Sequence, residues 1–475
     1  MSFVLLPSLK ITANVAGSSE LFAGEADFSE GFEFAESWPN TSDNPEPTAS
    51  FVTADFYDSY EGSGGWPNAF PYSYTETIVT SSGDAVDGGE GDQFGVAVDI
   101  TPDASVIAVG ASAADDPTGS AGSVTVLKNN GSNWYEEAVL TSSLPPTGAW
   151  QLGGWVTIVP TGDRIFAGQQ QYFGSPNREG SVVIFDSGSS GWEYTQLLTG
   201  SGNQSEPFGA PIDCNQSGER LFVGFGSYTI PGLGGSSFEG SIWVYNSGSS
   251  GYELGTIITS SGDWDSTDSV RLKACATNGA GDRLIGGSRT ASVSGSTGTS
   301  DGMVEFFRSG SGGWYQEGLL SASVSDGGQL GNAVDMSFDG DRAIAGANLA
   351  GEGKIYVFNS GSGGWNIEQV LTGSNITGGA NLGVDLVIND AGDTIFAGAY
   401  ADDTPVFQAG SALIFRSGSS GWYEEQKLTS SYTAGAPRLG IRVAMSADQR
   451  TLAAGAYLSD ISSSQAGHVS IFEVP

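Results

Sequence analysis

The acidic residues are the largest reservoir of chemistry in this sequence. The 475 residues include 54 Asp and Glu against 17 Lys and Arg. A calcium loop needs carboxylate oxygens at alternate positions, so that several ligands converge on one ion. None of the short turns that carry the acids has three alternating carboxylates, and most have one acid followed by Arg or a polar residue: TPDAS, PTGDR, QSGER, GAGDR, FDGDR, NDAGD and SADQR. An Arg would oppose a bound cation. We therefore predict surface hairpin turns, no metal site and no cofactor.

Two pairs of adjacent acids fall in longer loops, where the sequence leaves two interpretations open. They are Asp115-Asp116 and Asp402-Asp403. Weak cation binding and simple solvation both fit such pairs, and solvation is the commoner state of a surface carboxylate.

Nucleophiles and acid–base groups are scarce. The chain has one His, His468, and two Cys, Cys214 and Cys275. A Ser-His-Asp site would need a strand–Gly-x-Ser-x-Gly–helix elbow, which the sequence lacks. Two carboxylates could hydrolyse a glycoside, but no motif selects one pair among the 54 acids. We expect no catalytic residues and no enzymatic activity.

Aromatic residues recur after Ser-Gly turns such as GSSGW and GSGGW. The set is Trp134, Trp192, Tyr252, Trp314, Trp365 and Trp422. Such a series could stack on sugar rings. Its equal placement in unit after unit favours a structural role instead, at the turn into the last strand of each unit.

The charge balance excludes several partners. The net charge is −37 at pH 7. So acidic a chain lacks the basic footprint that nucleic acid requires, and it is repelled by anionic membranes. No apolar run approaches the length of a membrane span. The N-terminus, MSFVLLPSLK, has only four apolar residues before Pro7, so we expect no signal peptide.

Three glycine landmarks organise the chain into repeats of about 50 to 60 residues. The first is an aromatic residue or Leu before Gly: Phe94-Gly95, Leu152-Gly153, Phe208-Gly209, Leu330-Gly331, Leu382-Gly383 and Leu439-Gly440, with Ser269-Val270 as a degenerate member. The second is a Gly that ends a short apolar run: Gly110, Gly168, Gly224, Gly287, Gly346, Gly398 and Gly455. The third is a Gly that opens an alternating strand: Gly122, Gly180, Gly240, Gly302, Gly353, Gly410 and Gly467. Both Cys fall six residues after a first landmark, where other units have Ile or Met, so we predict that both are core residues.

These landmarks imply four short strands in each of seven units, and hence an all-β, seven-bladed β-propeller. The last unit stops after its third strand. Residues 72–82, YSYTETIVTSS, read like the fourth strands of the other units. We predict that this N-terminal strand pairs with the C-terminal blade and closes the ring, which removes the free sheet edges.

The repeat resembles the FG-GAP family of propeller repeats. The matching features are the Phe-Gly or Leu-Gly pair, the Gly-Ala after the second strand (Gly346-Ala347, Gly398-Ala399) and the Gly-x-Val-x-Val/Ile-Phe strand. The resemblance covers about 85% of the chain. It implies a fold, and it says little about function.

Residues 1–68 do not repeat, and we predict an extended N-terminal arm there, followed by the propeller at 69–475. Residues 1–69 hold 11 acids and one base. Their aromatic content is too high for a solvated tail. The aromatic residues that we assign to the arm's contacts are Phe3, Phe22, Phe28, Phe32, Phe34 and Trp38. Either the arm wraps its own propeller, or it docks on a neighbouring subunit; the second is favoured.

These features favour a non-enzymatic structural protein of a virion. The protein would be a phage tail or fibre component or a capsid decoration, assembled through its arm with the propeller outward. The expected partners are other virion proteins or copies of itself, with a host-surface receptor or glycan as a further candidate. The alternative is a secreted or cell-surface propeller that acts in adhesion or carbohydrate binding.

Overall fold

The structure, a computed structural model, describes residues 10–13, 22–25, 72–81, 91–116, 119–131, 133–142, 151–169, 180–200, 208–228, 239–260, 272, 274–291, 301–321, 328–461 and 464–474. The chain divides into two compact units, Met1–Gly64 and Gly65–Pro475. In the first, β1 (Lys10–Ala13) pairs antiparallel with β2 (Phe22–Glu25). The predicted boundary at residues 68 and 69 lies outside the described residues. The described residues contain no helix that could cross a membrane.

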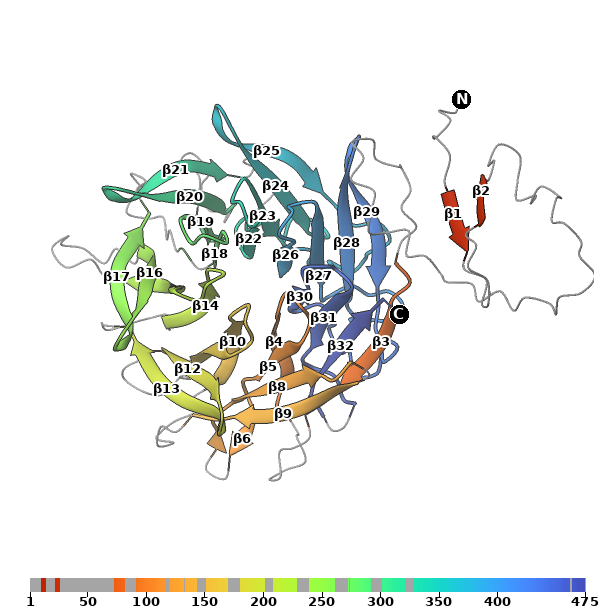
Figure 1. Ribbon diagram of the computed structural model, residues 1–475, viewed down its shortest axis with the longest axis horizontal. Coiled ribbons are helices and arrows are strands. Elements are labelled where there is room, and N and C mark those ends of the chain that lie inside the picture. Colours follow the sequence, from red (N-terminus) through yellow and green to blue (C-terminus); the bar gives the residue numbers. More distant parts are fainter. Residues whose placement is uncertain are drawn as a thin grey trace, which may run out of the picture. The chain divides into compact units, whose positions relative to one another are not determined.

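The second unit is a ring of four-stranded antiparallel sheets, as predicted (Figure 1). Blade one contains β4 (Phe94–Ile100), β5 (Val106–Ala111), β8 (Ser123–Asn129) and β9 (Trp134–Leu140). Blade two contains β10 (Leu152–Ile158), β11 (Arg164–Gln169), β12 (Ser181–Gly188) and β13 (Gly191–Thr199). Blade three contains β14 (Phe208–Cys214), β15 (Arg220–Tyr228), β16 (Glu239–Gly248) and β17 (Gly251–Thr259). Blade four contains β18 (Ala274–Thr277), β19 (Arg283–Ser288), β20 (Met303–Gly310) and β21 (Gly313–Ser321).

The remaining blades follow the same order from the channel outward. Blade five contains β22 (Val334–Met336), β23 (Arg342–Ala347), β24 (Lys354–Gly361) and β25 (Gly364–Leu371). Blade six contains β26 (Leu386–Ile388), β27 (Thr394–Ala399), β28 (Ser411–Gly418) and β29 (Gly421–Leu428). Blade seven contains β30 (Val443–Met445), β31 (Thr451–Ala456), β32 (His468–Glu473) and β3 (Thr75–Val79). A small ribbon of β6 (Asp115–Asp116) and β7 (Gly119–Ser120) extends blade one.

Strand β3 closes the ring, which confirms the predicted closure. It pairs antiparallel with β32, so that Thr75 lies opposite Glu473 and Val79 opposite Val469. Strand β3 is the outermost strand of blade seven. The polypeptide that precedes it is therefore attached at the rim of the propeller.

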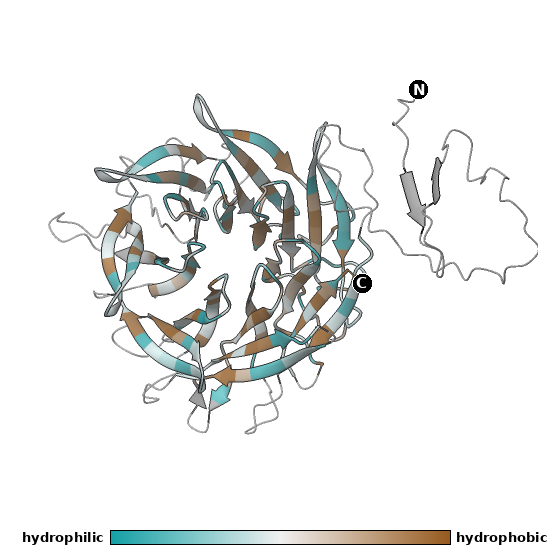
Figure 2. Cartoon of the chain, viewed as in Figure 1, coloured by the Kyte–Doolittle hydropathy of each residue, from teal (hydrophilic) through white to brown (hydrophobic). Residues whose placement is uncertain are grey.

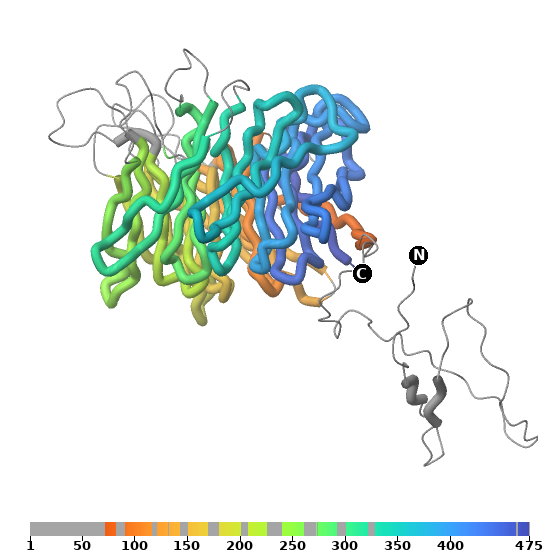
Figure 3. Tube along the Cα trace, turned by 90° about the horizontal axis from the view of Figure 1, so that it is seen from above, coloured from red at the N-terminus to blue at the C-terminus, as the bar shows by residue number. Residues whose placement is uncertain are grey.

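Burial explains the order of strands within a blade. The second strands, such as β5 and β27, are buried on both faces, whereas the outer strand β9 alternates between half-buried and exposed positions. Figure 2 shows the same gradient: apolar residues occupy the inner strands, and the outermost strands carry hydrophilic stretches. Figure 3 shows the strands running between the two faces of the ring.

The core lies between neighbouring blades. One buried cluster joins Phe306 of blade four to Phe358 of blade five, with ring centroids 5.6 Å apart. Another joins Ile355 of blade five to Phe415 of blade six. Each sheet is thus covered on both faces by other sheets, which suits strands made of Val, Ile and Phe.

The glycine landmarks meet at the junction between blades. A Cβ on Gly398, at the end of β27, would lie 1.8 Å from the carbonyl oxygen of Gly440 in the next blade. The same approach is made by the pairs Gly110 and Gly153, Gly168 and Gly209, Gly287 and Gly331, Gly346 and Gly383, and Gly455 and Gly95. The Gly before the third strand pairs with the landmark Leu or Phe of the next blade, as Gly410 does with Leu439. The repeated glycines are therefore positions where backbones of neighbouring blades touch.

Candidate functional site in the central channel

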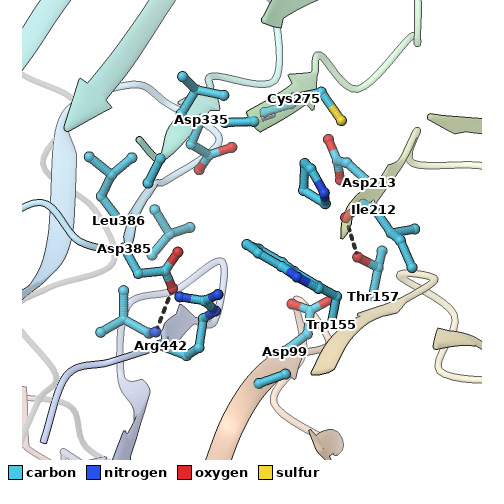
Figure 4. A pocket seen from close by; sticks show the side chains of 18 of the residues that line it. Asp99, Trp155, Thr157, Ile212, Asp213, Cys275, Asp335, Asp385, Leu386 and Arg442 are labelled. Carbon is cyan, nitrogen blue, oxygen red and sulfur yellow. Dashed lines mark hydrogen bonds between the residues drawn. The ribbon is translucent and has the colours of Figure 1, made fainter. Parts of the chain in front are cut away.

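The first strands of all seven blades line a central cavity of about 550 Å³. The polar residues that face it are Asp99, Asp213, Asp335, Asp385, Thr157, Asn332, Arg289 and Arg442. Trp155 projects across the opening, and the carboxylates surround it (Figure 4). Polar side chains from blades around the ring thus meet at one cavity, and this channel is the candidate site.

Three of the aspartates occupy one level of the channel. Asp99, Asp213 and Asp335 belong to blades one, three and five, and each follows a Phe-Gly or Leu-Gly landmark by five residues. In register, each lies opposite the third residue of its second strand. The same level is occupied by Thr157 in blade two and by Val387 in blade six.

Each of these carboxylates bridges two blades. Asp99 accepts hydrogen bonds from the backbone N–H of Ile100 (2.8 Å) and from that of Ile158 in blade two (2.8 Å). Asp213 does the same with Cys214 (2.8 Å) and Thr277 of blade four (2.7 Å). The side chains thus satisfy backbone donors that would otherwise be unpaired at the channel wall.

Asp335 repeats this arrangement between blades five and six. Its carboxylate accepts from Met336 (2.8 Å) and from Ile388 (2.7 Å). Between blades two and three, the hydroxyl of Thr157 donates to the carbonyl of Ile212 at 2.8 Å instead. The channel side chains therefore tie first strands together around the ring.

The channel environment shifts the titration of these aspartates. Burial raises the pKa of Asp99 to about 7, and repulsion from Asp213 and Asp385 adds to the shift, against the two backbone hydrogen bonds. Burial likewise raises the pKa of Asp213 to about 6. It raises the pKa of Asp335 well above its usual value, and there Asp213 and Asp385 contribute repulsion. The ring therefore carries less negative charge at neutral pH than four carboxylates would suggest.

Asp385 immediately precedes β26, two residues before Val387, and has a cationic neighbour. Burial raises its pKa, and the field of Arg442 opposes that shift. Asp385 accepts from the N–H of Val443 at 2.8 Å, which joins blades six and seven. The guanidinium of Arg442 lies over the Trp155 ring, 4.1 Å from its centroid, and so spans from blade seven to blade two. This cation–π contact narrows the channel.

A second polar chain runs through blades four, five and six. Arg289 donates to Asn332 at 3.1 Å, and Asn332 donates to the carbonyl of Val384 at 3.0 Å. Both contacts cross from one blade to the next, as the aspartate bridges do.

The two cysteines are free thiols. The sequence placed them at equivalent positions of their blades, and in the structure their registers differ. Cys214 lies opposite Leu221, as Ile100 lies opposite Ile107. Cys275 lies opposite Gly286, two residues earlier in register than Cys214. The degenerate landmark Ser269-Val270, from which the prediction was counted, lies outside the described residues. Cys275 is buried and Cys214 is half-buried against a core cluster. Burial raises the pKa of both thiols well above the usual value, so neither is an activated nucleophile.

The hairpin turns contain carboxylates that cap their own backbones. Asp103 accepts from Thr101 (2.7 Å) and from the N–H of Ser105 (3.0 Å). The Arg residues that follow such turns reach the next blade: Arg283 donates to the carbonyl of Gly340 at 2.8 Å, and Arg342 to that of Gly392 at 2.6 Å. The described residues contain no group of three or more His, Cys, Asp or Glu side chains that could hold a metal ion.

The blade-turn aromatics contact the preceding blade. The indole N–H groups of Trp134, Trp192, Trp365 and Trp422 donate to Glu473, Glu137, Glu317 and Glu368, at 3.1, 2.9, 3.4 and 3.1 Å. Tyr252 and Trp314 meet Phe166 and Phe222 edge-on, with centroids 5.3 and 5.8 Å apart. The predicted arm contacts Phe3, Phe28, Phe32, Phe34 and Trp38 lie outside the described residues, and Phe22 lies in β2.

The channel aspartates were not among the site residues predicted from the sequence. The signal was present, because Asp99, Asp213 and Asp335 share one offset from the first landmark. They were counted only among the 54 acids of the chain.

Comparisons with known proteins support the fold alone. No protein-family model matches the sequence, and no curated protein matches it. Among solved structures, the β-propeller domain of Myceliophteria thermophila Cps50 (Swd1) is 9% identical, with a TM-score of 0.54 over 84% of this chain and 100% of that one. A protein from Lactobacillus plantarum is 12% identical, with a TM-score of 0.49 over 75% of this chain and 90% of that one. A protein of unknown function from Desulfotomaculum acetoxidans is 11% identical, with a TM-score of 0.44 over 72% and 86%.

Proposed function

We propose that this protein is a non-enzymatic structural component of a virion, such as a phage tail or fibre protein or a capsid decoration. It assembles through its N-terminal arm and displays the acidic propeller outward. Its partners are other virion proteins or copies of itself, and its location is the virion.

One observation carries the proposal: the channel carboxylates are used as ties between blades. Asp99, Asp213 and Asp335 each accept one N–H from their own strand and one from the next blade. A catalytic carboxylate needs an oxygen directed at a substrate atom. Carboxylates whose oxygens accept hydrogen bonds from backbone N–H groups favour a rigid scaffold over a reaction site.

The route of the chain supports the role of the arm. Strand β3 is the outermost strand of its blade, so the residues before Tyr72 are attached at the rim of the ring. An arm attached at a rim can reach a neighbour without crossing the propeller. Its charge and its aromatic content fit a segment that is buried on assembly.

We also infer that the repeats are of the FG-GAP type. The Gly of the Phe-Gly or Leu-Gly pair meets the Gly that ends the second strand of the preceding blade. The motif is therefore explained by contact between blades, and it carries no ligand chemistry of its own.

The test is immunogold labelling of purified virus particles with an antibody against a surface turn of the propeller. Regular labelling at one part of the particle is expected. Absence of the protein from the purified particles would overturn the proposal.

Exposed aromatic rings on the outer strands favour a second candidate, a carbohydrate-binding propeller. Tyr315, Tyr135 and Tyr423 are 51%, 46% and 45% exposed. Such rings can stack on sugars. Glycan-array binding that is lost in Y315A and Y423A, with folding unchanged, would favour this candidate.

A further inference from the structure

The one histidine of the chain is buried in the blade that closes the ring. His468 opens strand β32, which pairs with β3 on one side and with β31 on the other. The side chain is fully buried. In the other blades this position is Ser123, Ser181, Ser241, Met303, Lys354 and Ser411. We call the pairing of β3 with β32, which closes the ring, the seam. Only at the seam does this position hold a group that titrates near neutral pH.

The imidazole nitrogens of His468 are poorly satisfied by hydrogen bonds. In blade six, Ser411 at the same position donates to Asp402 at 2.7 Å. The residue of blade seven that corresponds to Asp402 is Ser459, since each carbonyl accepts the N–H of the Gly before the third strand. Among the described residues, neither the Ser459 hydroxyl nor Nδ1 of His468 has a hydrogen-bond partner. Nε2 lies 3.5 Å from the Ser430 hydroxyl, at the limit of a hydrogen bond.

The groups around the His468 imidazole do little to stabilise its charged form. From β31, Ala456 lies opposite His468, and the backbone of Gly95 approaches from blade one. The loop of blade six contributes Ser430 and the edge of the Tyr432 ring, 5.9 Å away. From β3, the carboxylate of Glu76 is the charge whose field favours protonation.

Glu76 is also the side chain that fastens β3 to the ring. It accepts from the Ser470 hydroxyl of β32 at 2.6 Å and from the N–H of Ser431 in blade six at 2.7 Å. With its hydrogen donated to Glu76, the Ser470 oxygen can only accept from the Ser430 hydroxyl, which lies 3.3 Å away. Protonation at His468 therefore occurs within the hydrogen-bonded cluster that holds the closing strand.

We infer that the closing blade is an acid-sensitive latch, in which protonation of buried His468 weakens the attachment of β3 and releases the strand that carries the N-terminal arm. An open seam exposes the imidazole to water, where the cation is stable. A closed seam holds the cation in a buried site with an unpaired Nδ1. The latch concerns the ring itself and does not depend on the proposed function.

The pKa of His468 is shifted in the direction that this inference requires. Burial lowers the pKa of His468 to about 4, and Glu76 opposes this only in part. The folded-state pKa lies below the usual 6.5, so seam stability is complete above about pH 6.5 and is lost as the pH falls toward 4. Burial raises the pKa of Glu76, but its hydrogen bonds from Ser470 and Ser431 outweigh this and lower it, so its own contribution is lost only in stronger acid.

The test is hydrogen exchange of the full chain, followed by mass spectrometry at pH 7.5 and 5.5 and corrected for intrinsic rates. Linkage through one proton predicts that opening of β3 and β32 increases about tenfold between these pH values. Strand β28 of blade six, with Ser411 at the matching position, is the internal control and should not show this increase. Equal changes in β28 and β32 would overturn the inference.

Two variants separate the latch from general destabilisation. H468S installs the residue found in four other blades, and it should abolish the tenfold increase while β28 is unchanged. S459D supplies the carboxylate that Asp402 provides in blade six. It should reduce the tenfold increase in exchange by stabilising the charged imidazole of His468. Should H468S unfold, S459D still decides. A tenfold increase that persists in either variant would contradict the latch.

Discussion

Contact between glycines of neighbouring blades should be the most sensitive point of the ring, and G398A tests it. A Cβ at residue 398 would lie 1.8 Å from the Gly440 carbonyl oxygen, whereas ordinary contact begins at 3.4 Å. The backbone at Gly440, just before the first strand of blade seven, would therefore have to retreat by about 1.6 Å. The backbone of Gly398 does not have a positive φ, so the clash is the only penalty for Ala there.

The cost follows from the contacts that the retreat would stretch. The hydrogen bonds that join these blades nearby include those from Leu439 to Ala409 (3.0 Å) and from Val443 to Asp385 (2.8 Å). Losing a neutral bond costs about 1 kcal/mol, and a bond to a charged group about 2 kcal/mol. Overpacking adds about 1 to 3 kcal/mol. We expect G398A to lower the free energy of unfolding by about 4 to 6 kcal/mol.

The assay is urea unfolding monitored by tryptophan fluorescence, with G363A as the matched control. Gly363 also lacks a positive φ, and a Cβ there would meet no atom within 4 Å. Its replacement should change stability by less than about 0.5 kcal/mol. If G398A is as stable as G363A, the account of the glycine landmarks is wrong.

Three further predictions concern the channel, the rim and the ring closure. Burial raises the pKa of Asp99 to about 7, so its contribution to stability is complete below about pH 4 and is lost as the pH rises through 7. D99N should flatten the fall in unfolding free energy between pH 5 and 8, by up to about 1.4 kcal/mol per pH unit in urea titrations; an unchanged slope would place the titration elsewhere. W422F removes the indole donor to Glu368 and should cost about 1 kcal/mol in the same assay, whereas a change within error would show that the contact contributes nothing. E76Q should loosen β3 at every pH while leaving the tenfold exchange increase at pH 5.5 in place, and loss of that increase would assign it to Glu76.

The ring could be predicted from the sequence because its main constraints recur from blade to blade. Glycines such as Gly346 and Gly398 recur where backbones must touch, and the aromatic residues such as Trp192 recur where one blade meets the next. These residues are required in every blade, so they repeat visibly. The closing strand was predictable for the same reason, because Thr75–Val79 has the pattern of a fourth strand.

The channel was less predictable, because its ties vary from blade to blade. The level that holds Asp99 in blade one holds Thr157 in blade two and Val387 in blade six. A position that varies in this way leaves only a weak period in the sequence. The error at Cys275 has a related cause: the landmark of blade four is degenerate, so counting from Ser269 placed the cysteine two residues out of register. The unpartnered groups of Ser459 and His468 could not be predicted from the sequence, because burial and hydrogen bonding depend on the fold.

The most direct test of the proposed role is incorporation into virus particles. Full-length chain and a chain lacking residues 1–68 would be supplied to particles that lack the endogenous protein, and their copy numbers measured by quantitative mass spectrometry. The truncated chain keeps Tyr72 and strand β3, so its ring can close, and circular dichroism would verify its fold. We predict that the full-length chain is incorporated and that the truncated, folded chain is not. Equal incorporation of both, or of neither, would contradict assembly through the arm.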